Sequence, residues 1–596
     1  MGASFRAIIY AHGMGDQERY GELSNLVHSL GRASKSRTAE QGVLTPAFVQ
    51  NEPLHGGNGK DISYLNLVRQ DQQELRCYEV YWAPITAGKS NALEVLRWIL
   101  PQALNAIRLL RSDWTGQGRM RRLTLHRMWA ERIRQGPNDH AAEFKTLLEA
   151  YSDFLDPSLI HQREHHAIKS TKSFPNYLNE WLPAHHTAPT TSAKVIALAR
   201  AWQRELVMAC WRDMFTLLLL PVLLIQVIVL LVTLLASSFV LLGQVSVFKS
   251  LTATITSTFG LGAYLDAIRQ FTVGYEYLKI AEAFVLVHIK FPGIWLLPAI
   301  VLAGTWFALW NLQLFLRDFL GDVQLWTTYQ ENNTKHATRE EILTCARSVF
   351  DHVLHNEDCA GITVIAHSLG STIMLDALSR LGREARAEQS INPTPGPDSL
   401  SERIKKIKYF ITLGSPIDKV YFFFESRRVK LKELDRLIEH QRGDITLEPL
   451  KNLTWLNFFD QGDPVSGTVF SANPASNLMP FVRNVEVSNY AYPSISSHGG
   501  YFLHRDVLNT MYDAAFDLPI DIKLPLSTAQ KANQTTQSAR WFYPVLLTIP
   551  ILALLTFAPG ESLAALRDGA AFGLLCCGVY VGVNGIRAGF QHRRPV

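Results

Sequence analysis

Short hydrophobic runs recur along this chain, many of them alternating with polar residues. They predict buried β-strands over residues 5–13, 75–84, 361–366, 407–413, 453–459 and 482–488. Helical spacing of apolar residues predicts helices over residues 340–354 and 372–386. Strands that alternate with helices predict a mostly parallel α/β sheet flanked by helices.

A second hydrophobic pattern consists of long apolar runs without charge. Four such runs lie at residues 215–242, 291–316, 541–560 and 569–586. About 20 apolar residues span a bilayer as a helix, so we expect four transmembrane helices paired as two hairpins. Arginines flank these runs, among them Arg212, Arg317 and Arg587. By the positive-inside rule they predict an integral protein of a bacterial inner membrane, with the α/β part on the cytoplasmic side.

These two patterns divide the chain into four parts. Residues 1–88 and 340–523 are the two halves of one α/β domain. Residues 89–339 are a helical insertion with the first two spans, and residues 524–596 are a linker and a C-terminal transmembrane hairpin.

Composition narrows the function classes. The formal net charge is +5 over 596 residues, and lysines and arginines are scattered, which argues against nucleic-acid binding. The six cysteines form no C-x-x-C pair and no metal-ligand spacing, as in a reducing compartment. The first residues lack a basic segment followed by an apolar one, so no cleaved signal peptide is expected.

The strongest chemical signal is AHSLG at residues 366–370, between the strand GITVIA and the helix STIMLDALSRLG. A serine on such a sharp turn is strained, and bulky side chains two positions to either side would clash. Ala366 and Gly370 meet this requirement, with His367 and Ser368 between them. The segment resembles the G-x-S-x-G nucleophile elbow of α/β hydrolases, in the A-H-S-x-G form of some lipases, with alanine replacing the first glycine.

A second likeness is YAHGMGDQ at residues 10–17, which follows the first strand. It resembles the His-Gly segment of lipase-like α/β hydrolases, represented here by His12 and Gly13. The resemblance covers about half of the chain. It implies an oxyanion hole made by the amides of Met14 and Leu369.

The resemblance also implies an acid and a base that follow the nucleophile in that order. After the run at 453–459 comes DQGDPVSG, in which Asp463 is the expected acid and Asp418, after the preceding strand, the alternative. After the run at 482–488, His498 lies in a glycine-containing turn and is the expected base, with His504 as a weaker candidate. An imidazole must take the serine proton, and a carboxylate orients the imidazole.

Two competing motifs are weaker. HQREH at residues 161–165 fits the zinc pattern H-x-x-E-H, but no third ligand follows at a suitable place. HGGNGKD at residues 55–61 resembles a phosphate loop but has Asp61 where serine or threonine should stand. We therefore expect neither a metal nor another cofactor.

The fold expected is thus an α/β-hydrolase-type sheet interrupted by a helical transmembrane insertion and followed by a transmembrane hairpin. The activity expected is hydrolysis of carboxylic esters through an acyl-enzyme, with a lipid or another ester as substrate and the bilayer as partner. The alternatives are an inactive membrane scaffold with the same fold and an antibacterial lipase effector.

Overall fold

The structure is a computed structural model, which divides the chain into two units: residues 1–215, 318–539 and 590–596, and residues 216–317 and 540–589. The residues that it describes are 4–15, 17–35, 42–57, 59–95, 97–99, 141–155, 174–185, 192–202, 310, 313–327, 334–420, 444–445, 448–460, 463, 465–469, 482–487, 496–520, 573 and 575–579.

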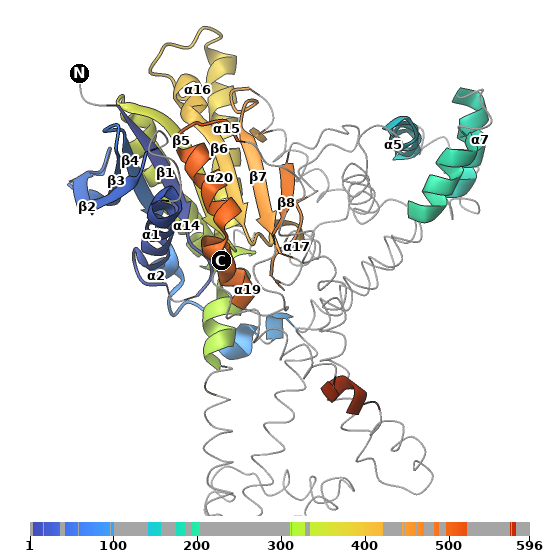
Figure 1. Ribbon diagram of the computed structural model, residues 1–596, viewed down its shortest axis with the longest axis horizontal. Helices are drawn as coiled ribbons and strands as arrows, with labels where there is room; N and C mark the ends of the chain where they lie inside the picture. The colour runs from blue at the N-terminus through green and yellow to red at the C-terminus, as the bar shows by residue number, and fades with distance from the viewer. Residues whose placement is uncertain are drawn as a thin grey trace, which may run out of the picture. The chain divides into compact units, whose positions relative to one another are not determined.

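Eight strands form one sheet (Figure 1). They are β1 Phe5–Ala11, β2 Leu44–Pro53, β3 Asp61–Arg69, β4 Glu74–Val80, β5 Cys359–His367, β6 Ile407–Leu413, β7 Thr454–Phe459 and β8 Val482–Glu486. The α-helices are α1 Gly21–Lys35, α2 Ala83–Thr86, α5 Ala141–Leu155, α7 Phe174–His185, α13 Gly321–Trp326, α14 Thr334–His355, α15 Gly370–Ile391, α16 Leu400–Arg403, α17 Ile417–Val420, α19 Ser496–Gly499 and α20 Arg505–Ala515. Shorter turns of other helix types are η3 Phe315–Leu320, η4 Ile404–Lys406 and η6 Gly500–Leu503.

The sheet is mixed, with strand order β2-β3-β4-β1-β5-β6-β7-β8. The six strands from β4 to β8 in this order run parallel, and β3 pairs antiparallel with both β4 and β2. Strand β1 lies at the centre, between β4 and β5. From β1 the chain first builds one side of the sheet and later, from β5, the other side.

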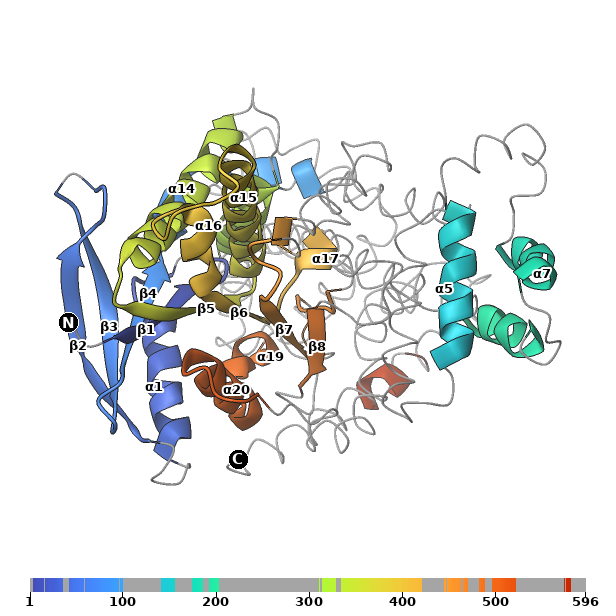
Figure 2. The same ribbon diagram turned by 90° about the horizontal axis from the view of Figure 1, so that it is seen from above.

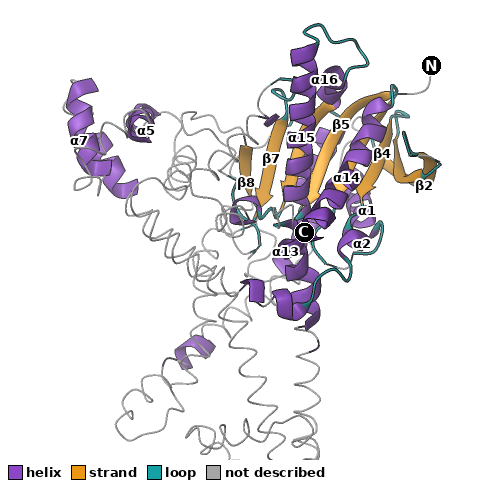
Figure 3. Cartoon of the chain, turned by 180° about the vertical axis from the view of Figure 1, so that it is seen from behind, coloured by secondary structure: helices purple, strands orange, loops and turns teal. Residues whose placement is uncertain are grey.

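Helices cover both faces of the sheet (Figure 2). Helices α1 and α20 lie on one face, while α14 and α15 lie on the other, which Figure 3 shows from behind. Strand β1 explains why: Ala7, Ile9 and Ala11 pack in the core with α14 and α15, whereas Ile8 and Tyr10 pack in the core with α1 and α20. A strand buried on both faces needs apolar residues at successive positions, and β1 has them.

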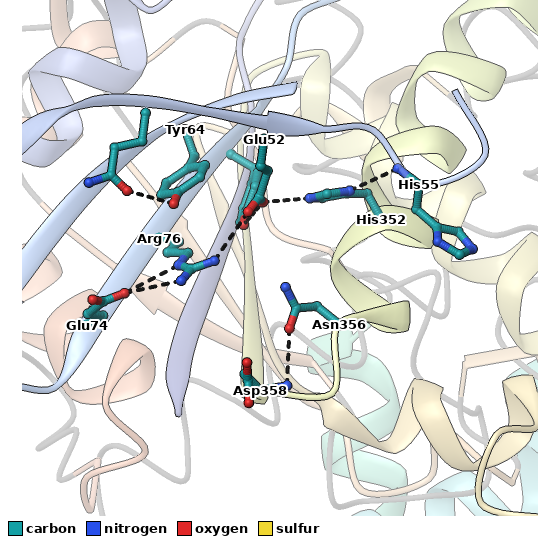
Figure 4. Close-up of polar contacts among 10 residues, drawn as sticks. Glu52, His55, Tyr64, Glu74, Arg76, His352, Asn356 and Asp358 are labelled. Atoms are coloured by element: carbon teal, nitrogen blue, oxygen red, sulfur yellow. Dashed lines mark hydrogen bonds and ion pairs between the residues drawn. The ribbon is translucent and has the colours of Figure 1, made fainter. Parts of the chain in front are cut away.

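The antiparallel edge was not anticipated from the sequence. Strand β2 contains Pro46 and Pro53, and its Phe48 is exposed, so it lacks the apolar pattern of a buried strand. A polar cluster ties this edge to α14 (Figure 4). Glu52 of β2 accepts hydrogen bonds from the Tyr78 hydroxyl at 2.7 Å and from Nε2 of His352 at 2.6 Å.

The expected fold class and localisation need correction. Among the residues that the structure describes, no helix combines the length and the apolar character needed to cross a bilayer. The expectation of a transmembrane insertion, a transmembrane hairpin and an integral membrane protein is therefore corrected to what the described residues show, a mixed α/β sheet with helices. Hydropathy measures the apolar content of a run and not the helix that the run forms. The runs at 215–242 and 541–560 lie outside the described residues, as do nearly all of 291–316 and 569–586.

Part of the insertion has a small core of its own. Side chains of α5, α7 and residues 192–202 pack together, including Phe144, Leu182 and Trp202. This cluster contributes no residue to the site described below.

Candidate active site

The candidate residues gather where the parallel strands end. Strands β1 and β5 end at residues 11 and 367, and His12 and Ser368 follow them directly, whereas Asp463 and His498 lie in the segments after β7 and β8. The order of strands reverses between β1 and β5. In open α/β sheets, such a switch point at the carboxyl edge is where ligands bind.

Ser368 has the backbone conformation of a strained turn. Its φ angle is +52°, in the left-handed region that residues other than glycine rarely adopt. Its amide donates to the carbonyl of Leu413 at 2.9 Å, which holds the turn against the end of β6. Its Oγ is buried and has no hydrogen-bond partner among the described residues. A strained, unpaired hydroxyl at this place is typical of a nucleophile.

The small residues that flank Ser368 are required by the backbone of β1. A Cβ on Gly370 would lie 2.5 Å from the carbonyl oxygen of His12 and 2.7 Å from that of Ala11. Both contacts are with main-chain atoms of the central strand and its exit, so no side-chain movement could relieve them. Ala366 is fully buried in the core.

Asp463 and His498 are joined by a hydrogen bond. His498 Nδ1 lies 2.7 Å from Oδ2 of Asp463, which also accepts from the Tyr501 hydroxyl at 2.9 Å. The other carboxylate oxygen accepts from the amides of Val465 at 2.8 Å and Ser466 at 3.2 Å. Four donors for one buried carboxylate favour its ionised form.

The pKa of Asp463 follows from these contacts. Burial raises it, but the hydrogen bond and charge of His498, together with the charge of Lys419, outweigh burial and hold the pKa below its ordinary value. Asp463 is therefore a carboxylate at neutral pH and can stabilise a protonated His498.

Gly414 brings His498 to the nucleophile. It follows Leu413, whose carbonyl binds the Ser368 amide, and a Cβ on Gly414 would lie 3.1 Å from both Nδ1 and Cε1 of His498. The imidazole thus packs on the backbone next to the elbow. No hydrogen bond joins Ser368 Oγ to His498 among the described atoms, and in enzymes without substrate this bond is often long.

The loop after β1 lies against the elbow. A Cβ on Gly13 would lie 3.1 Å from Cβ of Ser368. The next residues carry the Met14 amide, and Gly15 donates its own amide to the buried Asp322 at 2.9 Å. The Leu369 amide is at the start of α15, where the helix dipole favours negative charge. These two amides are the expected oxyanion donors.

His12 has a structural role next to this loop. Its Nε2 accepts from the Trp82 amide at 3.2 Å, so its Nδ1 carries the proton donated to the Gly13 carbonyl at 2.9 Å. Burial lowers the pKa of His12 more than neighbouring groups raise it, which keeps the ring neutral. The ring stacks on the Trp82 indole with centroids 4.9 Å apart.

The other sequence candidates fall elsewhere. Asp418 lies in α17, and His504 is the residue before α20. Residues 55–57 and 59–60 lie between β2 and β3, and Asp61 begins β3, while the H-x-x-E-H motif at 161–165 is outside the described residues. Where the structure is described, no group of three or more histidine, cysteine or acidic side chains is arranged to hold a metal.

Sequence reasoning missed three partners of the site: Glu22, Tyr501 and Asp322. Glu22 lies in the first turn of α1 and reaches His367, Tyr501 holds Asp463, and Asp322 holds the loop after β1. No motif marks them, because each meets its partner through the fold. Tyr501 alone had a local signal, since it lies three residues after His498.

Comparison of the chain with family models, curated proteins and solved structures finds no match. A function for the chain is therefore inferred from the geometry of these residues.

Proposed function

We propose that this chain is a serine hydrolase of carboxylic esters. The observation that carries the proposal is the hydrogen bond between His498 and Asp463. The His498 ring packs on the backbone of Gly414, next to Ser368, whose φ angle lies in the left-handed region. The three residue types follow the order Ser, Asp, His of α/β hydrolases.

The reaction would proceed in two steps. Ser368 Oγ attacks the ester carbonyl carbon as its proton passes to Nε2 of His498, and the amides of Met14 and Leu369 stabilise the oxyanion. The C–O bond to the alcohol then breaks, and the alcohol leaves with the proton from His498. A water repeats the sequence on the acyl-enzyme and releases the carboxylic acid.

The charges of the site support this assignment. Proton transfer makes His498 a cation, and the buried Asp463 carboxylate is already in contact with it. A non-catalytic scaffold would gain nothing from the strain at Ser368, which costs of order 1–3 kcal/mol. A lipid ester is the narrower substrate proposal. The aromatic run YFFF at residues 421–424, which would suit an acyl chain, lies outside the described residues.

Labelling with a fluorophosphonate tests the proposal. We expect the wild-type protein to be labelled and Ser368→Ala to take no label, because only the activated hydroxyl forms the covalent adduct. Ser379→Ala is the matched control, since Ser379 is also a buried serine of the same segment whose Oγ has no partner among the described residues. Undiminished labelling of Ser368→Ala would contradict the proposal. Parallel assays with nitrophenyl esters of short and long acids would show whether lipid-like chains are preferred.

A further inference from the structure

His367, the residue directly before Ser368, has an oxygen at each ring nitrogen. Its Nε2 lies 2.9 Å from the main-chain carbonyl oxygen of His498. Its Nδ1 lies 3.4 Å from Oε2 of Glu22, and its side chain is only 6% exposed. Carbonyl and carboxylate oxygens only accept hydrogen bonds. A neutral imidazole has one N–H and would turn a lone pair toward one of them, whereas an imidazolium satisfies both.

Glu22 supplies the negative charge that such a cation needs. It also accepts from the Tyr10 hydroxyl at 2.6 Å and from the Gly13 amide at 3.3 Å. Although burial raises its pKa, the charge and hydrogen bond of His367 and the hydrogen bond of Tyr10 lower it to about 2. Glu22 is therefore ionised at any pH at which the protein would be assayed.

The surroundings of His367 fit a charged ring. Burial lowers its pKa, but Glu22, the carbonyl of His498 and Asp463 raise it above the ordinary value. The titratable groups that face or adjoin the ring from the elements around it are Tyr10, His12, Glu22, Asp463, His498 and Tyr501.

We propose that His367, held as an imidazolium by Glu22, is a positioning residue that fixes the main chain of His498 and so directs its imidazole toward Ser368. The inference rests on the proposed hydrolase function. His498 is then held twice, through its ring by Asp463 and through its carbonyl by His367. When His498 accepts the serine proton, two imidazolium rings with centroids 4.8 Å apart are balanced by two carboxylates, Asp463 and Glu22.

Loss of the second proton of His367 should weaken this arrangement. The folded-state pKa of His367 is raised. Its contribution to the placement of His498 is therefore complete below the ordinary histidine pKa and disappears as pH rises through the folded-state pKa. The proposal thus requires an alkaline limb in the pH profile of kcat that belongs to His367.

The experiment compares kcat and KM across pH for p-nitrophenyl butyrate with wild type, His367→Gln and Glu22→Gln. We expect His367→Gln to lower kcat by roughly 10–100-fold with KM little changed and to remove the alkaline limb, because misplaced catalytic groups lose about this factor. Glu22→Gln should move the alkaline limb to lower pH by about one unit or more. This second variant keeps an acceptor for Tyr10 and serves where His367→Gln fails to fold.

His352→Gln is the matched control, since His352 faces Glu52, which also accepts from the Tyr78 hydroxyl, at the antiparallel edge of the sheet. It should leave kcat and the pH profile unchanged. If His367→Gln keeps the wild-type kcat and profile, or Glu22→Gln leaves the alkaline limb in place, while wild type is labelled by fluorophosphonate, the positioning role is overturned and the hydrolase proposal stands. A wild type that takes no label would overturn both.

Discussion

Tyrosine, glutamate and histidine meet at two places in this sheet, one at the carboxyl edge and one at the antiparallel edge. At the first, Glu22 accepts from Tyr10 and faces His367. At the second, Glu52 accepts from Tyr78 and faces His352. The three residue types are the same, yet the fourth partner differs. Nε2 of His367 meets a carbonyl oxygen, whereas Nδ1 of His352 accepts the amide of His55 at 3.1 Å.

This difference assigns different hydrogen-bonding roles to the two histidines. A ring that meets two acceptors satisfies both only by donating twice, while a ring that accepts an amide at one nitrogen donates at the other alone. The first histidine adjoins Ser368 and the second lies on α14. Since both histidines have a carboxylate partner, what distinguishes them is the backbone group at the second nitrogen, an acceptor at His367 and a donor at His352.

Asp463→Asn should have the largest effect on activity, and it changes the carboxyl edge while leaving the antiparallel edge intact. We expect kcat to fall roughly 10³–10⁴-fold, since an amide does not stabilise the imidazolium and favours the wrong tautomer of His498. Steady-state kinetics on a nitrophenyl ester would measure this. Asp418→Asn should stay within about twofold of wild type. A severe loss in Asp418→Asn with a mild one in Asp463→Asn would move the acid to α17.

Glu79 gives a third glutamate to compare with Glu22 and Glu52. It is buried, and no hydrogen bond joins it to a histidine among the described residues. Its Oε2 accepts the Tyr20 amide at 2.7 Å, and its Oε1 has no partner among the described residues. Burial, reinforced by the charge of Glu22, raises its pKa to about 7 despite the Tyr20 bond. The contribution of protonated Glu79 to the free energy of unfolding is therefore complete below the ordinary glutamate pKa. It is lost as pH rises to about 7.

Glu79→Gln should thus stabilise the protein at pH 8 relative to wild type, by at most about 3 kcal/mol, and change little at pH 4. Urea unfolding at both pH values measures the difference. An equal effect at the two pH values would show that Glu79 does not titrate with folding.

Glu52→Gln should have the smallest effect. We expect the free energy of unfolding to fall by about 1 kcal/mol, because the hydrogen bonds from Tyr78 and His352 lose their charged acceptor. The value of kcat/KM should not change. A selective loss of activity in a stably folded Glu52→Gln would break the separation of the two clusters.

Strands that are buried on both faces of the sheet could be predicted from the sequence. Strands such as β5 and β6 are near-continuous apolar runs and were located to within two residues. Strands β2 and β3 were missed. Strand β2 is an edge strand without an apolar pattern, whereas β3 is paired on both sides and largely buried, so its apolar residues were overlooked. The membrane expectation rested on long uncharged runs and their flanking arginines, and no helix among the described residues bears it out.

The candidate site shows the same division. Ser368, Asp463 and His498 could be located because their order and turn context are local signals, and their catalytic roles remain predictions. Glu22 could not be predicted, since no motif near it in the sequence indicates a contact with the distant His367. Contacts between distant segments depend on strand order, which no local pattern contains.

The central place of β1 has a consequence for how the protein forms. Phe5 pairs with Glu74 on one side and with Cys359 on the other. During synthesis the first partner emerges soon after β1, but at roughly 5–20 residues per second the second emerges only about 20–70 s after β1. Until then one edge of the apolar β1 has no strand beside it and is open to aggregation. The elbow and the loop after β1 meet only when β5 pairs with β1. Activity should therefore appear only at the end of folding, after the exposed edge of β1 has been covered.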